Sequence, residues 1–284
     1  MRDMNTEKVW FVTGASKGLG LTLTKKLLND GFKVAATSRS IGDLTKAIGK
    51  QDNSFFPLEV DLLNEQSVQN AVEQTLNAFS AIDVVVNNAG YGQTGTIEEL
   101  SDKEVRQNYD VNVFGTLNVI RSVMPHLRAK RSGHIFNISS VGGFFSGYPG
   151  WGIYCSTKFA VAGLTEALHT EGKPFGIKVT VVYPGYFRTS FLSKDSMILP
   201  SKPIEEYEEA RKVVDFHKNS MDGNQKGDPE KAATALIQVA SAENPPLHLF
   251  LGTDAYEVAS EKIASLQKDL SAWKDLTLST DIDE

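Results

Sequence analysis

The sequence predicts an α/β fold, with a single doubly wound (Rossmann-type) parallel sheet and helices on both faces. Strand-like and helix-like segments alternate almost from the first residue, which is the pattern of repeated βα units. The strand-like segments are apolar along their whole length, so both faces of the sheet must be covered. No break in the alternation marks a boundary, so residues 1–284 are expected to form one dinucleotide-binding and catalytic domain.

The expected strands are short apolar runs rich in β-branched and aromatic residues. They span residues 8–13, 32–38, 54–60, 82–86, 134–139, 177–183 and 247–251. The expected helices carry apolar residues at intervals of three or four. They span residues 19–29, 41–48, 65–79, 102–127 and 154–170. A last helix opens at Asp228, an N-cap residue, with Pro229 in its first turn.

Two regions depart from this alternation. Residues 186–227 form a long insertion, in which substrate selectivity is expected to reside. Residues 253–284 form a polar extension that is expected to be helical and to cover either the edge of the pocket or an oligomer face.

Composition excludes several classes of protein. The chain carries 29 Lys and Arg against 35 Asp and Glu, a formal net charge of −6, which repels nucleic acid and anionic membranes. A single cysteine, Cys155, cannot form an internal disulfide, and the histidines lack metal-binding spacing, so no metal is expected. The N-terminus lacks a signal-like segment and no apolar run approaches the roughly 20 residues of a membrane span, which predicts a cytoplasmic protein.

The first βα turn is rich in glycine. It reads Thr13-Gly14-Ala15-Ser16-Lys17-Gly18-Leu19-Gly20. Glycines allow a tight turn and let the backbone approach a pyrophosphate, while the following helix points its N–H groups at that phosphate. The alternative is a glycine-rich turn that serves chain geometry alone.

The end of the second strand indicates which dinucleotide binds. A ribose 2′-hydroxyl is usually held by an acidic residue about 20 positions beyond the turn, whereas a 2′-phosphate needs a cation. Residues 31–42 contain no acid; Ser38 stands where one is expected, Arg39 follows it, and Lys17 lies on the same rim. This pattern favours NADP(H). The alternative is that both cations only face solvent.

A tyrosine and a lysine four residues apart carry the predicted chemistry. Tyr154 and Lys158 share one helix face, so an ammonium lies beside a phenol. A nearby cation favours the phenolate and moves its pKa toward the value that an acid/base catalyst needs. The preceding strand ends in Ser139-Ser140, whose hydroxyls can reach a substrate oxygen in the crevice.

Together these motifs resemble the short-chain dehydrogenase/reductase family, from about residue 8 to about residue 251. The residues that carry the resemblance are the 13–20 turn, Asp61, Asn87-Asn88-Ala89-Gly90, Asn112, Ser140, Tyr154, Lys158 and Pro184-Gly185. The resemblance implies that Tyr154 is the general acid/base, that Lys158 lowers its pKa and holds the nicotinamide ribose, and that Ser140 polarises the carbonyl. It also implies that Asn112 positions a helix kink and a proton-relaying water.

The resemblance further implies a set of cofactor contacts. Asp61 would hydrogen-bond the adenine with Leu62 beside it, Asn88-Ala89-Gly90 would pack beside the adenosine ribose, and Thr189, after Pro184-Gly185, would bind the carboxamide. Ser140 precedes Tyr154 by one residue more than in most family members, so Ser139 remains a second candidate. Family members often form homo-oligomers, and a dimer or tetramer is expected here.

The predicted function is NADP(H)-dependent interconversion of a ketone or aldehyde and an alcohol. Nine apolar residues near the expected pocket favour a bulky hydrophobic substrate, unless they pack against the sheet or a partner subunit. They are Phe144, Phe145, Tyr148, Trp151, Phe187, Phe191, Met197, Ile198 and Leu199. The main alternative is a non-catalytic NADP(H)-binding regulatory protein on the same fold. A dehalogenating lyase is disfavoured by Lys158 and the intact glycine turn.

Overall fold

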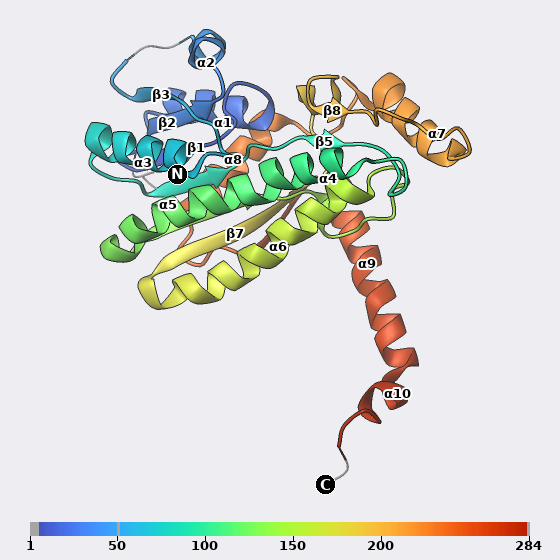
Figure 1. Cartoon of the computed structure of the whole chain (residues 1–284). Helices are drawn as coiled ribbons and strands as arrows, with labels where there is room; N and C mark the ends of the chain where they lie inside the picture. Colours follow the sequence, from blue (N-terminus) through green and yellow to red (C-terminus); the bar gives the residue numbers. More distant parts are fainter. Residues whose placement is uncertain (1–5, 50–51, 283–284) are drawn as a thin grey trace.

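A computed structural model describes residues 6–49 and 52–282 of the chain. Seven parallel strands form one sheet in the order β3-β2-β1-β4-β6-β7-β9 (Figure 1). They are β1 (Val9–Val12), β2 (Lys33–Ser38), β3 (Phe55–Glu59), β4 (Val84–Asn87), β6 (Gly133–Ile138), β7 (Ile177–Pro184) and β9 (His248–Leu251). The doubly wound α/β prediction is confirmed. The expectation for the extreme N-terminus concerns residues 1–5, which lie outside the described residues.

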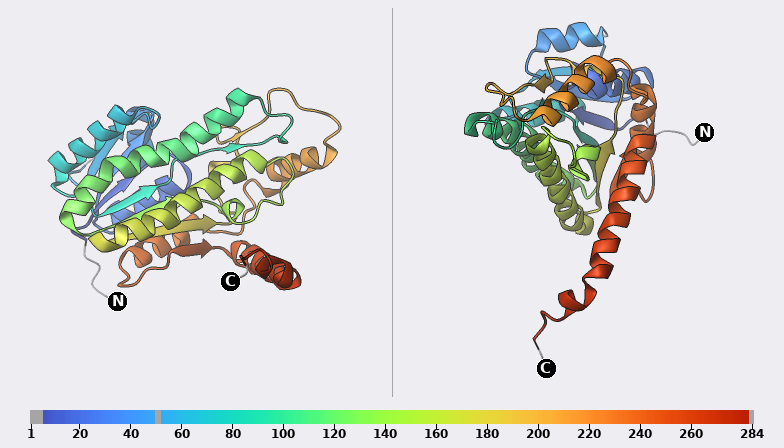
Figure 2. Two further views of the ribbon diagram at one scale, coloured as in Figure 1. Left: turned by 60° about the horizontal axis from the view of Figure 1, so that its bottom comes forward. Right: turned by 90° about the vertical axis from the view of Figure 1, so that its right-hand side faces the viewer.

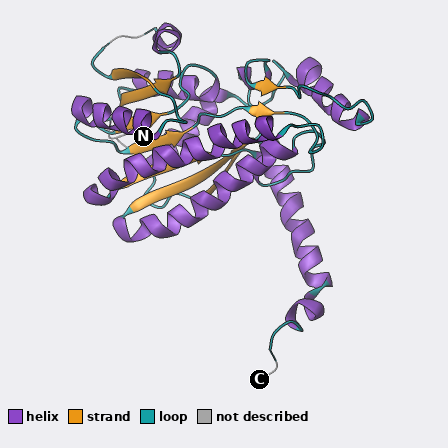
Figure 3. Ribbon diagram, in the orientation of Figure 1, coloured by secondary structure: helices purple, strands orange, loops and turns teal. Residues whose placement is uncertain are grey.

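Helices cover both faces of the sheet (Figures 1 and 3). One apolar cluster joins the sheet to α1 (Gly18–Asn29), α2 (Ile41–Ile48) and α8 (Pro229–Ala240). A second joins the other face to α3 (Glu65–Phe79), α5 (Gly115–Lys130) and α6 (Gly152–Gly172). Since helices pack on both sides, the central strands are almost wholly buried, as their unbroken apolar character requires.

The order of the strands determines where a crevice forms at the edge of the sheet. β1 pairs with β2 on one side and with β4 on the other, so successive βα units run outward in opposite directions from this point. In doubly wound sheets ligands bind outside the carboxyl ends of the strands where the order reverses. Gly14 follows β1 and Asn88 follows β4, so the predicted glycine turn opens into this crevice.

The prediction of a single helix over residues 102–127 is wrong in detail. The structure has α4 (Asp102–Tyr109), a π-helical turn (Asp110–Phe114) and then α5. Within the π-turn, the buried Asn112 amide binds the backbone of Tyr91 and the Thr157 hydroxyl, each at 3.0 Å. The α-helical hydrogen bonds are interrupted where the Asn112 side chain makes these tertiary contacts. The spacing of apolar residues along a helix does not reveal such contacts.

Two very short strands were not predicted. β5 (Gly92–Gln93) and β8 (Met197–Ile198) pair in parallel as a separate sheet. Two residues are too few to show the alternation by which a strand is recognised. The pairing attaches the 186–227 insertion to the end of the main sheet.

The C-terminal extension is helical, as predicted, and points away from the body (Figure 2). It comprises α9 (Thr253–Ala272) and α10 (Lys274–Leu278). Asp254, in the first turn of α9, accepts a 2.6 Å hydrogen bond from the Tyr186 amide beside the cavity, but later turns leave the body. Apolar residues on these turns are exposed, for example Ile263 and Trp273. The expected homo-oligomer remains a prediction.

Within the described ranges, none of the helices is both long enough and apolar enough to cross a bilayer.

Candidate active site

A cavity of about 650 Å³ lies at the carboxyl ends of the strands. It is lined by most of the predicted site residues: Gly14, Ser16, Lys17, Gly18, Leu19, Ser38, Arg39, Asp61, Leu62, Asn88, Ala89, Gly90, Ser140, Tyr154, Lys158, Pro184, Gly185 and Thr189. They come from the ends of six different strands and from the turns and helices that follow these strands, so only the tertiary fold brings them together.

The glycine turn is shaped by close backbone approaches. Gly14 and Gly18 have φ of +64° and +59°, which other L-residues adopt at a cost. A Cβ on Gly14 would also lie 2.8 Å from the Ala89 Cα. The Asn88 amide donates to the Thr13 and Gly14 carbonyls at 3.0 and 3.1 Å, which ties the turn to the end of β4.

Gly20, which is predicted to contact the cofactor, is not among the residues that line the cavity. A Cβ at this position would lie 2.4 Å from the Asn88 Nδ2. The glycine therefore makes room for the Asn88 amide beneath the turn, and its role is packing.

Two cations lie on the rim beside Ser38. The Lys17 ammonium donates to the Asp195 carbonyl at 3.0 Å, which connects the glycine turn to the 186–227 insertion. Burial lowers the pKa of Lys17, the nearby charge of Asp195 raises it, and the nearby charge of Arg39 lowers it. The two cations are therefore close enough to interact. Glu59 lies beside Ser38 in the strand register, but it accepts a hydrogen bond from the Ile41 amide and does not line the cavity.

Tyr154 and Lys158 lie one turn apart on α6, and both are buried. The Lys158 Nζ lies 5.8 Å from the centre of the Tyr154 ring and donates to the Ile138 carbonyl at 2.9 Å. The carbonyl at the end of β6 thus fixes the position of the ammonium in the wall of the cavity.

The structure contradicts the expected direction of the Tyr154 pKa shift. Burial raises the pKa of Tyr154 well above its usual range, and a hydrogen bond with Ser140 offsets only part of this effect. Burial also lowers the pKa of Lys158 to about 8. Desolvation disfavours the charged form of both groups and is the largest cause of each shift. The phenol is therefore held protonated at neutral pH.

The two serines at the end of β6 differ in what their hydroxyls do. The Ser139 hydroxyl is buried and donates to the Lys158 carbonyl at 2.8 Å. The Ser140 hydroxyl accepts from the Gly142 amide at 3.0 Å and lies close enough to Tyr154 to lower the pKa of its phenol. The longer spacing between serine and tyrosine therefore leaves Ser140, not Ser139, beside the phenol.

Asn112 is the one predicted catalytic residue that does not line the cavity. A Cβ added to Gly90 would lie 2.9 Å from the Asn112 Oδ1 and 3.4 Å from the Lys158 Nζ, so the two polar groups flank this glycine. With its amide bound to Tyr91 and Thr157, Asn112 holds the loop after β4 against α6.

The apolar residues near the site divide into two groups. Five of the nine line the cavity, namely Tyr148, Trp151, Phe187, Phe191 and Ile198. The other four do not: Phe144 packs against Tyr183 and Phe250, Phe145 against Tyr148, Met197 is buried beneath the site, and Leu199 is exposed.

Several cavity residues were not predicted. They are polar side chains far apart in the sequence, including Gln93, Glu104, Gln107, Tyr186, His217 and Gln225. None belongs to a motif, and a lone histidine such as His217 carries no positional signal in the sequence. Only the fold shows that they share a cavity with Tyr154.

A model of the short chain dehydrogenase family matches residues 8–197. The chain belongs to this family. The oxidoreductase BOA17 of Botryotinia fuckeliana is 36% identical over 274 residues, which cover 96% of this chain and 99% of that protein. The 3-ketodihydrosphingosine reductase of Bacteroides thetaiotaomicron is 36% identical over 247 residues, covering 86% of this chain and 88% of that protein. A short-chain dehydrogenase from Streptomyces avermitilis has a solved structure with a TM-score of 0.87 and 32% identity, covering 96% of this chain and 100% of that one.

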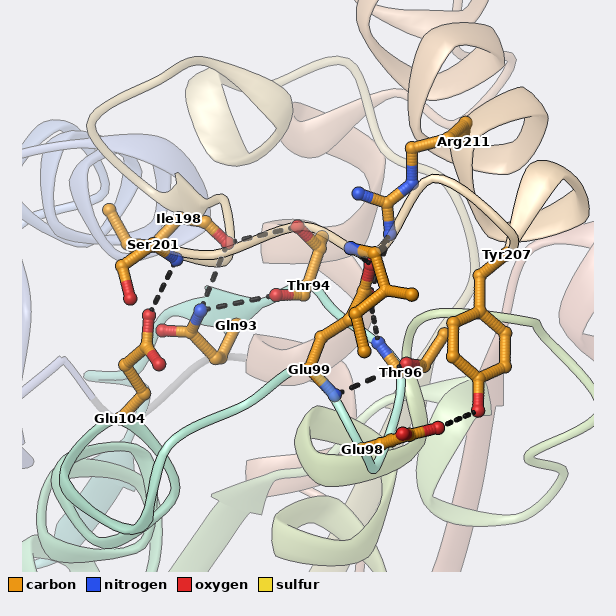
Figure 4. Close-up of polar contacts among 11 residues, drawn as sticks. Gln93, Thr94, Thr96, Glu98, Glu99, Glu104, Ile198, Ser201, Tyr207 and Arg211 are labelled. Atoms are coloured by element: carbon orange, nitrogen blue, oxygen red, sulfur yellow. Dashed lines mark hydrogen bonds and ion pairs between the residues drawn. The ribbon is translucent and has the colours of Figure 1, made fainter.

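Residues 198–211 of this short-chain dehydrogenase follow the part of the chain that the family model matches. They are held by a polar network (Figure 4). Contacts along this segment join Thr94 to the Ile198 carbonyl (3.0 Å), the Ser201 amide to Glu104 (2.9 Å) and the Tyr207 hydroxyl to Glu98 (2.5 Å). The network anchors one wall of the cavity to the segment between β5 and α4.

Glu99 is the centre of this network. Its side chain is 0% exposed and accepts from the amides of Thr96 and Ile204 at 2.7 Å and from the Arg211 guanidinium at 2.6 Å. Burial alone would raise the pKa of Glu99, but these hydrogen bonds and the Arg211 charge outweigh it, so the pKa lies below its usual value.

We expect Glu99→Gln to lower the free energy of unfolding by about 1–3 kcal/mol near neutral pH, because Arg211 loses its charged partner. Since the folded-state pKa is depressed, the contribution of the carboxylate is present above the unfolded pKa and is lost as pH falls through the folded pKa. Urea unfolding between pH 3 and 7 should show a smaller acid-side loss in the variant. The exposed neighbour Glu98, changed to Gln, is the control; equal pH slopes for wild type and Glu99→Gln would contradict the assignment.

Proposed function

We propose that this short-chain dehydrogenase is an NADPH-dependent reductase that converts a ketone or aldehyde into an alcohol. The observation that carries the proposal is that Tyr154, Lys158 and Ser140 line the same cavity as the glycine turn. Reduction of a carbonyl by a nicotinamide needs both a proton donor and a nucleotide-binding turn. Either feature can occur without the other, so their presence in one cavity supports this reaction.

The residues of the cavity fit a nicotinamide dinucleotide with a 2′-phosphate. Gly14 lets the first turn pack against Ala89, and α1 begins four residues later at Gly18, where its N-terminus would face the pyrophosphate. Lys17 and Arg39 flank Ser38 at the adenosine end, where a 2′-phosphate would find two cations. When bound, NADPH supplies the hydride.

Tyr154 is the proton donor in the proposed mechanism. Because burial holds its phenol protonated, it can donate a hydrogen bond to the substrate carbonyl together with the Ser140 hydroxyl. As negative charge grows on that oxygen, the Tyr154 proton moves to it and an alcohol forms. The Lys158 ammonium, held by Ile138, stabilises the phenolate that remains.

The substrate is proposed to be bulky and apolar around its carbonyl. Aromatic side chains, among them Trp151, Phe187 and Phe191, line the cavity and would bury such a group. The similar protein from Bacteroides thetaiotaomicron is named a reductase of 3-ketodihydrosphingosine, which supports a keto substrate.

The test is an NADPH-oxidation assay with paired substrates, an aryl or long-chain ketone against a short polar keto acid. We expect a higher kcat/KM for the apolar ketone. A higher value for the keto acid would assign the aromatic cluster to packing. NADPH binding without turnover on any carbonyl would instead favour the regulatory alternative.

Ser140→Ala should lower kcat more than Ser139→Ala does. Ser140→Ala loses a hydrogen bond to the reacting oxygen, and removal of such a donor lowers kcat by about 10²- to 10³-fold. Ser139→Ala loses the bond to the Lys158 carbonyl, so its main effect should be a loss of about 1 kcal/mol of stability. Steady-state kinetics and thermal unfolding of both variants separate the two effects. A larger fall in kcat for Ser139→Ala would reverse the assignment.

A further inference from the structure

A tyrosine–histidine pair lies in the cavity and has no part in the proposed proton transfer. Tyr186 follows β7, and His217 begins a π-helical turn (His217–Met221); both line the cavity. The Tyr186 hydroxyl lies 2.8 Å from the His217 Nε2. Ring contacts link this pair to the proton donor, since Trp151 lies 5.1 Å from His217 and 5.5 Å from Tyr154 between centroids.

The direction of the hydrogen bond in this pair follows from the other ring nitrogen. The His217 Nδ1 lies 2.6 Å from the Val213 carbonyl, which can only accept, so Nδ1 carries the proton. Burial lowers the pKa of His217 and keeps the imidazole neutral, so Nε2 has a free lone pair. The Tyr186 hydroxyl therefore donates to Nε2, and its oxygen is left with lone pairs only.

This arrangement makes the Tyr186 hydroxyl a hydrogen-bond acceptor only, as far as a ligand in the cavity is concerned. A free tyrosine hydroxyl can donate or accept, but here its proton is already used by His217. Toward the cavity it can only accept. The complementary substrate group is a hydrogen-bond donor such as a hydroxyl.

Two other side chains that line the cavity have polar atoms without a partner among the described residues. The Gln225 side chain is 1% exposed and lines the cavity, and neither of its amide atoms has a hydrogen-bond partner among the described residues. The same holds for the buried Trp151 Nε1. Buried polar atoms left unpaired cost about 1–3 kcal/mol each. Around the cavity, these atoms therefore keep hydrogen-bonding capacity that a polar ligand group can use.

We propose that Tyr186, oriented by His217, binds a hydroxyl group that the substrate carries near its carbonyl, so that the enzyme prefers hydroxyketones. The inference rests on the proposed reductase function and narrows its substrate class. The apolar wall formed by Trp151 and Phe191 would hold the rest of the molecule, while the hydroxyl sets which way the carbonyl points in the cavity.

The test compares three ketones of one carbon skeleton in the NADPH-oxidation assay: a hydroxyketone, its methyl ether and the analogue without oxygen at that position. The methyl ether keeps an acceptor but has no donor. Wild type should prefer the hydroxyketone by roughly three- to tenfold in kcat/KM, the effect of one neutral hydrogen bond. Tyr186→Phe should bring the three values to within about twofold of one another.

Two further variants make the test specific. In His217→Phe the Tyr186 proton is free, so the hydroxyl can donate as well as accept, and the preference for the hydroxyketone over the ether should disappear. Tyr183→Phe is the matched control, because Tyr183 lies 3.3 Å from the His248 Nδ1 in a second tyrosine–histidine pair that does not line the cavity. It should retain the wild-type preference.

The possible outcomes separate this inference from the function on which it rests. Equal kcat/KM for the three ketones in wild type, or a preference that survives in Tyr186→Phe, would overturn the role of Tyr186 and leave the reductase intact. No turnover of any ketone by wild type, with NADPH bound, would overturn both.

Discussion

Tyr154→Phe is expected to lower kcat for carbonyl reduction by about 10²- to 10⁴-fold, the usual contribution of a positioned acid/base group. The substitution removes the hydroxyl group, and with it the proton that is donated, but changes the volume of the side chain very little. Because burial holds the Tyr154 phenol protonated, the variant loses a proton donor that is ready at neutral pH. Single-turnover kinetics with saturating NADPH measure this effect directly.

Nucleotide binding provides the control for this variant. The glycine turn and the rim cations belong to other elements and keep their own contacts in this variant, so the Kd for NADPH, followed by fluorescence, should stay within about threefold of wild type. A normal kcat in Tyr154→Phe would rule out the proposed mechanism. A normal kcat with a weakened Kd would place Tyr154 in binding alone.

Ser38→Asp is expected to reverse the preference for NADPH over NADH. The new carboxylate would stand beside the site proposed for the 2′-phosphate and repel it, while it could accept hydrogen bonds from a free ribose hydroxyl. The ratio of kcat/KM for NADPH to that for NADH should fall by about 10- to 100-fold, a penalty of a few kcal/mol for like charges in contact.

Ser40→Asp is the matched control for this change. It adds the same charge two residues away, but Ser40 does not line the cavity and caps α2 through the Asp43 amide at 3.2 Å, a role that aspartate also fills. Its nucleotide preference should remain that of wild type. A wild-type enzyme that prefers NADH would show that Lys17 and Arg39 serve another purpose.

Local sequence patterns were sufficient for the architecture. The helices over residues 41–48 and 65–79 were predicted with their observed bounds, since an amphipathic repeat and capping residues at both ends are local features. Tyr154 and Lys158 could be placed side by side because four residues make about one helical turn. The glycine turn likewise follows from its own strand and helix.

Other features depend on residues that are far apart in the chain. The β5–β8 pair, the contact of Glu99 with Arg211 and the pairing of Tyr186 with His217 each join segments separated by 31 to 112 positions or by intervening elements. No short-range pattern specifies such contacts, because they form only when the sheet has positioned both segments.

The sequence by itself therefore determined the family, the order of the βα units and a set of site residues most of which line the cavity. The tertiary structure decided which of Ser139 and Ser140 faces the phenol, that Gly20 packs beneath the turn, and that burial raises the pKa of Tyr154. The physical reason is the same in each case. Hydrogen-bond partners and desolvation depend on everything that surrounds a group in space, whereas periodicity and spacing report only on its neighbours along the chain.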